Sequence, residues 1–191
     1  LYPQSDSFLA LNDAGLPNPN RYFINEFPLY SAVVAVLYRQ FGIDESIGRM
    51  VSIFMATLGA LALYGTVRLL LGVPLALSSL FYYLVLPYNV FYGRVFMPDP
   101  SFVALSIISV YWCVVWVKTD KTAPALALML SFALAMLVKP YAIFIALPMV
   151  YWVFANWGWG ALRRPLVYLV AIGSLLPLIL WRYHFYLHPE G

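Results

Sequence analysis

The chain has 191 residues, of which 63% are hydrophobic and only 10% are charged. A soluble domain carries about a quarter charged residues, so this composition excludes a soluble fold and indicates an integral membrane protein. The formal net charge is +3, and the basic residues form no stripe of the kind that binds nucleic acid. The single cysteine, Cys113, excludes a disulfide within the chain.

The chain begins with a polar segment and a short apolar one. Residues 1–27 are rich in turn-forming residues, among them Pro17 and Pro19, and are expected to form an aqueous loop at the membrane surface. Residues 28–41 are apolar, but crossing a bilayer takes about 20 residues. We therefore predict a juxtamembrane helix here, with Pro28 at its first position.

Six apolar runs follow and are expected to cross the membrane as helices. The predicted fold class is all-α, a polytopic membrane helical bundle of about six transmembrane helices plus the juxtamembrane helix. Strands are not expected, because the runs are long and lack an alternation of period two. The runs are 47–71, 75–93, 101–117, 123–138, 140–157 and 165–183.

The charges between the runs indicate an orientation. When the spans alternate, one face receives basic loops that are nearly free of acids, which is typical of the cytoplasmic side. The other face has loops of mixed charge, so residues 1–27 and 184–191 are expected to be extracytoplasmic. The first set is Arg68, Lys118, Lys121, Arg163 and Arg164 with Asp120; the second is Glu26, Asp44, Glu45 and Asp99 with Arg21, Arg39, Arg49, Arg94, Lys139 and Arg182.

One lysine interrupts the apolar sequence. Lys139 is the only residue between 123 and 154 that is charged at neutral pH, and Pro140 follows it. A charged amine in lipid hydrocarbon costs several kcal/mol, about 3 on insertion scales, so such residues are functional-site hypotheses. Because proline ends a helix, we predict a turn between two spans that holds the ammonium at a membrane face.

Three further charged residues are candidates for the same face, and each has a simpler interpretation. Asp99, in Met97-Pro98-Asp99-Pro100, has the sequence of a helix N-cap, and Glu26 also stands just before a helix start. Arg94 and Lys139 have side chains long enough to reach lipid headgroups. The sequence alone leaves both interpretations open.

Three segments carry a resemblance to a known family. Glu26-Phe27-Pro28-Leu29-Tyr30 with Gly48-Arg49-Met50, the acidic break Tyr92–Pro100, and the turn Leu137–Tyr141 occur in the order and spacing of one group of enzymes. The chain resembles polyprenyl-phosphate-sugar-dependent membrane glycosyltransferases of the C-type fold. These are the dolichyl-phosphate-mannose–protein mannosyltransferase and aminoarabinose-transferase-like enzymes.

The resemblance implies an inverting transferase that moves a hexose or pentose from a polyprenyl-phosphate donor to a protein, lipid or glycan. The active site would face outward from a bacterial plasma membrane. By position, Lys139 and Arg94 would bind the donor phosphate, while Asp99 and Glu26 would be the catalytic carboxylates that orient donor sugar or acceptor. The only cofactor that the resemblance suggests is a divalent cation, for which Glu26 would be a ligand.

Two departures from the family limit this inference. In the family, the general base belongs to an Asp-Glu pair on the loop after the first span. This sequence contains neither that span nor that loop. We therefore expect it to be an internal fragment that is inactive alone. Phe27 stands where aminoarabinose transferases have lysine, which argues against that donor and a lipid A acceptor. Two alternatives remain, namely a transporter or lipid flippase, whose broken helices also hold charges, and a scaffold without chemistry.

Overall fold

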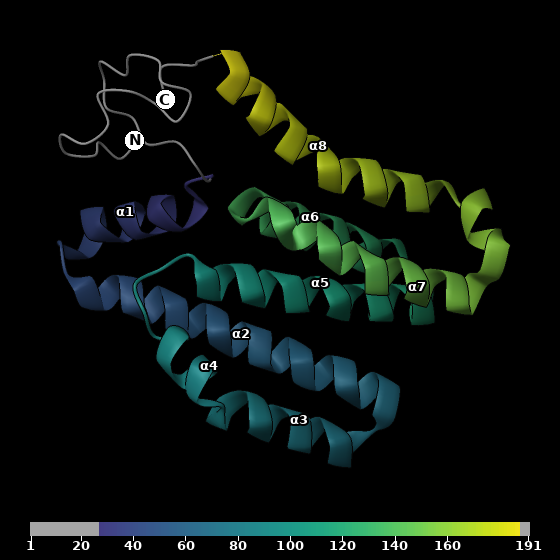
Figure 1. The fold of residues 1–191 in the computed structure, drawn as a ribbon, viewed down its shortest axis with the longest axis horizontal. Coiled ribbons are helices and arrows are strands. Elements are labelled where there is room, and N and C mark those ends of the chain that lie inside the picture. The colour runs from purple at the N-terminus through teal and green to yellow at the C-terminus, as the bar shows by residue number, and fades with distance from the viewer. Residues whose placement is uncertain (1–26, 188–191) are drawn as a thin grey trace.

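The computed structural model describes residues 27–187, and this part of the chain is helical throughout, with no strand (Figure 1). It therefore confirms the predicted all-α membrane bundle. Glu26 and the rest of the two terminal segments lie outside the described residues. The elements are α1 (Leu29–Phe41), α2 (Glu45–Leu71), α3 (Val73–Val85), α4 (Pro87–Tyr92), α5 (Asp99–Thr119), α6 (Thr122–Val138), η1 (Pro140–Ile145), α7 (Ala146–Trp157), η2 (Gly158–Arg163) and α8 (Pro165–Leu187).

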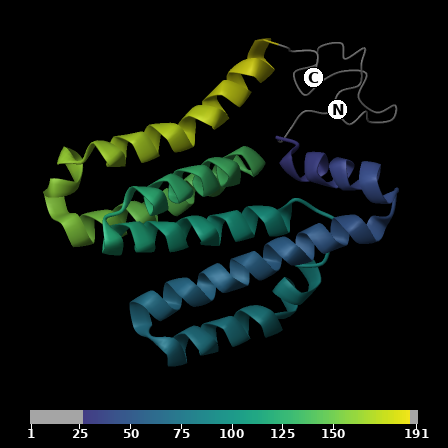
Figure 2. The same cartoon turned by 180° about the vertical axis from the view of Figure 1, so that it is seen from behind.

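The helices run back and forth between two ends of the bundle, joined by short turns (Figures 1 and 2). Gly72 and Gly158 end α2 and α7 with positive φ angles of 90° and 56°, which a residue without a Cβ adopts at little cost. Lys139 ends α6 in an extended conformation because the Pro140 ring excludes the helical region for the residue before it.

Proline also divides one predicted span. The run 75–93 was expected to be a single helix, but α3 ends at Val85 and α4 begins at Pro87. Leu86 between them has φ −59° and ψ 122°, again the extended conformation that a following proline imposes. A smaller correction concerns Pro28, which occupies the N-cap of α1 rather than its first helical position.

Several of the helices have the length and composition of membrane spans. Within residues 27–187, four segments are both long and apolar enough to cross a bilayer: Glu45–Leu71, Asp99–Thr119, Pro140–Arg163 and Pro165–His184. α3 and α6 are shorter apolar helices. The 17 residues of α6 extend about 26 Å, close to the roughly 30 Å hydrocarbon core. The prediction of about six spans agrees with this arrangement.

α5 is the central helix of the bundle. It packs against α2 on one side and α6 on the other, and α6 also contacts α8. Small residues make the approach of α2 to α5 close, since a Cβ added at Gly59 would lie 3.1 Å from the Ala104 Cα. Membrane helices commonly associate through such small residues. Large apolar side chains such as Phe54 and Ile172 instead lie exposed on the outside, as expected for surfaces that contact lipid.

Replacing Gly59 with leucine should destabilise the protein, because the new side chain would meet the backbone of α5. Overpacking of this kind costs about 1–3 kcal/mol. The matched control is Gly160→Leu, since a Cβ at Gly160 meets open space. Thermal unfolding of the detergent-purified protein should show a lower Tm for Gly59→Leu alone; equal Tm values for the two variants would contradict the close α2–α5 contact.

Candidate active site

The site is built around an ion pair between two distant breaks in the helices. The Lys139 Nζ lies 2.6 Å from the Asp99 Oδ1. Lys139 is at the junction of α6 and η1, while Asp99 is the first residue of α5. The lysine side chain is only 13% exposed and the aspartate 35%. Two of the four residues singled out in the sequence are therefore in direct contact.

This geometry corrects the simpler interpretation of Asp99 and gives Lys139 a partner within the protein. The N-cap of α5 is Pro98, so the N-cap interpretation of Asp99 is wrong by one position. The Asp99 carboxylate still lies in the first turn of α5, where the helix dipole favours a negative charge. The Lys139 ammonium bonds to this carboxylate and lies 5.7 Å from the centre of the Tyr141 ring.

Arg94 lines the same cavity as Asp99 but forms no ion pair within residues 27–187. It belongs to the irregular segment 93–98 between α4 and α5, its side chain is exposed, and within residues 27–187 it has no ion-pair partner. Arg94 and Asp99 both line a cavity of about 450 Å³ between α2, α3, α4 and α5. The structure thus places Arg94 beside the site without pairing it, and the headgroup interpretation of Arg94 stays open.

The cavity beside the ion pair is almost entirely apolar away from these two charges. Its walls come from the facing sides of four helices, and it is open to the surroundings. Such a cavity fits a hydrocarbon chain better than a sugar. The apolar lining includes Ile53, Ala56, Ala60 and Leu61 of α2, Leu80, Tyr83 and Leu84 of α3, and Pro100 and Val103 of α5.

The metal prediction rests on a residue that the structure does not place. Glu26, named both as a catalytic carboxylate and as a metal ligand, lies outside the described residues. Among residues 27–187 no group of three or more His, Cys, Asp or Glu side chains is arranged to hold a metal ion. The part played by Glu26 therefore stays a prediction.

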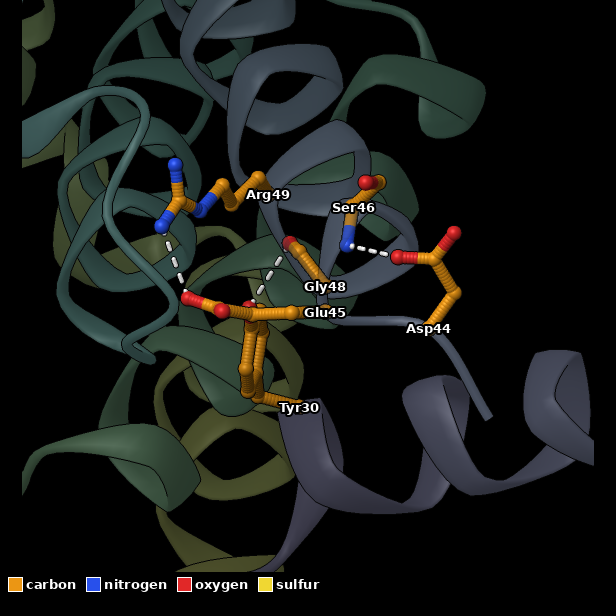
Figure 3. A network of polar contacts seen from close by, with 6 residues as sticks. All are labelled: Tyr30, Asp44, Glu45, Ser46, Gly48 and Arg49. Carbon is orange, nitrogen blue, oxygen red and sulfur yellow. Dashed lines mark hydrogen bonds and ion pairs between the residues drawn. The ribbon is translucent and has the colours of Figure 1, made fainter.

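Tyr30, to which the sequence analysis assigned no role, contacts α2 at Gly48 (Figure 3) and, through Ser52, holds the segment that carries Arg94. The buried Tyr30 hydroxyl of α1 donates to the Gly48 carbonyl at 2.8 Å and lies 3.1 Å from the Ser52 Oγ. The Ser52 hydroxyl in turn donates a long hydrogen bond, 3.5 Å, to the Met97 carbonyl. The Phe96 ring packs edge-on against Tyr30 with centroids 5.7 Å apart. These contacts join α1, α2 and the segment leading to Asp99.

The start of α2 is fixed by local contacts beside this tyrosine (Figure 3). The Asp44 side chain caps α2 by accepting a hydrogen bond from the Ser46 amide at 2.8 Å, and this bond lowers the pKa of the Asp44 carboxyl. Arg49 and Glu45 form an exposed ion pair one turn apart. Glycine at 48 and serine at 52, four residues apart, signal a close contact on this face of α2, but the sequence does not say which side chain fills it.

Tyr30→Phe should weaken this junction, because it removes the hydroxyl but keeps the ring. Leaving the buried Gly48 carbonyl and Ser52 hydroxyl without this partner costs about 1–3 kcal/mol. We expect a lower Tm and faster hydrogen exchange in segment 93–98. Tyr82→Phe is the control, since Tyr82 is 69% exposed. Equal Tm values for the two variants would show that the Tyr30 hydroxyl contributes nothing.

Comparison with known proteins gives one result. The family model described as dolichyl-phosphate-mannose-protein mannosyltransferase matches residues 25–183, which include all the helices from α1 to α7 and most of α8. Searches of curated proteins and of solved structures return no match to this chain. The match covers the breaks at Asp99 and Lys139 as well as the cavity between α2, α3, α4 and α5. The chain belongs to the dolichyl-phosphate-mannose-protein mannosyltransferase family.

Proposed function

We propose that this chain carries the donor-binding part of a glycosyltransferase that takes a sugar from a polyprenyl phosphate. Family membership supports glycosyl transfer in general. The observation that carries the more specific proposal is the ion pair of Lys139 with Asp99, because Asp99 also lines an apolar cavity together with Arg94. A cation next to a hydrocarbon-sized cavity matches a substrate that joins a phosphate to a long apolar chain.

The positive charges suit the leaving group of the reaction. An acceptor oxygen attacks the anomeric carbon, the bond from that carbon to the phosphate oxygen breaks, and its electron pair stays on the phosphate. The Lys139 ammonium has three donors, so it can bind a phosphate oxygen while it keeps its bond to Asp99. Charge-assisted contacts of this kind stabilise an anion as it forms. Arg94, without an ion-pair partner in residues 27–187, would supply the second positive charge.

The carboxylates would have a different part. Asp99 holds Lys139 in place and, on the cavity side, can accept hydrogen bonds from sugar hydroxyl groups. Glu26 would act with it as a second orienting carboxylate. Attack from the side opposite to the phosphate inverts the anomeric configuration. The proton of the acceptor hydroxyl goes to a base, a part that we assign to no residue between 27 and 187.

The apolar cavity supports a lipid-linked donor. Its walls continue away from Arg94 and Asp99 between α2 and α3, where leucine and tyrosine side chains would pack along the isoprenoid chain. A transporter is less well supported, because the charges lie at the ends of helices and not halfway along them. We place the site on the extracytoplasmic side of the membrane. The proposal specifies neither the sugar nor the acceptor.

The role of Lys139 can be tested by removing its charge and by exchanging the two charges of the ion pair. In the full-length protein, Lys139→Met should reduce sugar transfer by about 10²–10³-fold, the usual effect of removing one stabilising donor. The exchange of Asp99→Lys with Lys139→Asp should restore stability but not transfer, because the cation has moved. The assay is transfer from a panel of polyprenyl-phosphate sugars, with Tm and membrane insertion measured in parallel. Full transfer by the exchanged variant would exclude the proposed part for Lys139.

Arg94 should affect donor binding without affecting stability. Arg94→Gln removes an exposed charge that makes no ion pair within residues 27–187, so its Tm should not change. We expect the KM for the polyprenyl-phosphate donor to rise about tenfold, the loss of one charge-assisted contact of about 1.5 kcal/mol or more. Arg49→Gln, another exposed arginine at this end, is the control. An unchanged KM in Arg94→Gln would leave Arg94 as a headgroup anchor.

A further inference from the structure

The end of the bundle opposite to the ion pair carries a second group of charges that the proposed reaction does not use. Two turns meet there, the one between α5 and α6 and the one between η2 and α8 (Figures 1 and 2). An ion pair between Arg164 and Asp120 joins them directly. The Arg164 guanidinium also lies over the Trp157 ring, 4.0 Å from its centre. Arg164 is therefore held from two sides.

Neutralising Asp120 in this way leaves an excess of positive charge at the same place. Lys118 and Lys121 lie within two residues of Asp120, and Arg163 is next to Arg164. All three are exposed, and none has an ion-pair partner among residues 27–187. We call Lys118, Lys121 and Arg163 the basic cluster. Three exposed cations thus lie within two positions along the chain of an ion pair whose own charges are already balanced.

The start of α6 adds to the attraction for an anion. Its N-cap is Lys121, which supplies no side-chain hydrogen bond to the first amides of the helix. The N-terminus of a helix carries a partial positive charge and free N–H groups, and both favour an anion such as phosphate. The basic cluster and the α6 N-terminus therefore favour the same kind of ligand.

The apolar surroundings indicate that this ligand has a hydrocarbon part. Trp159 and Leu162 of η2 are 81% and 44% exposed, and Leu169, on the second turn of α8, is 51% exposed. Tryptophan at such a position is typical of the boundary between headgroups and acyl chains. A soluble anion would gain nothing from these side chains, whereas a phospholipid can place its phosphate on the cluster and its acyl chains against η2 and α8.

We infer that the basic cluster binds the phosphate of an anionic phospholipid at the junction of α5, α6, η2 and α8. The bound lipid links the turn that ends α5 to the turn that starts α8, in addition to the Arg164–Asp120 pair. This site lies at the end of the bundle away from Lys139 and does not depend on the proposed sugar transfer.

The test is lipid binding by the full-length protein, measured by native mass spectrometry with phosphatidylglycerol or phosphatidylcholine added. Phosphatidylglycerol should bind more tightly. The affinity should fall about fivefold in Arg163→Gln, the contribution of one cation near an anionic lipid surface, and far more in Lys118→Gln/Lys121→Gln/Arg163→Gln. Arg163→Lys should retain the affinity, which separates loss of charge from loss of fold.

Arg68→Gln is the matched control. Arg68 is an exposed arginine at the same end of the bundle, but on α2, whose turn lies apart from η2 in both views (Figures 1 and 2). An equal loss in Arg68→Gln and Arg163→Gln would show diffuse attraction and overturn the proposal. So would equal binding of the two lipids by the unchanged protein, or displacement of phosphatidylglycerol by millimolar inorganic phosphate, which would indicate a site for a free anion.

Discussion

A charged lysine at the end of an apolar helix needs a partner, and this requirement ties the structure together. Lys139 terminates α6 with its side chain largely out of water, where an isolated ammonium would be costly. Asp99, 40 positions earlier in the sequence, supplies the opposite charge from the first turn of α5. Because each residue is held by its own proline-defined break, the pair fixes α5 relative to the start of η1. The arrangement of the candidate site follows from this contact.

Proline provides the breaks that the ion pair requires. Pro140 holds Lys139 extended, and Pro98 with Pro100 defines the start of α5. Pro87 separates α3 from α4, so that the chain turns back toward α2 and closes one side of the cavity beside Asp99. In each case a proline breaks the helix, and polar groups or a cavity wall lie at that break. The middle of the bundle keeps the continuous helices that a membrane demands.

The helices could be predicted from the sequence, because apolar runs and prolines determine where spans begin and end. Alternation of the spans also placed Asp99 and Lys139 at the same end. Their direct contact could not be predicted, since it depends on α5 and α6 being neighbours, which only packing decides. The division of 75–93 was missed although Leu86-Pro87 signals it. Tyr30 was missed for another reason, since its hydrogen bonds to α2 form only when α1 folds back.

The two ends of the bundle differ in charge balance. At one end a balanced ion pair borders an apolar cavity, and at the other an unbalanced basic cluster surrounds Arg164. The most direct test of the account is a structure of the full-length protein with bound polyprenyl phosphate. We predict the phosphate within hydrogen-bond distance of the Lys139 Nζ, with the isoprenoid chain between α2 and α3. A phosphate bound away from Lys139, with the Lys139–Asp99 pair facing no ligand, would contradict it.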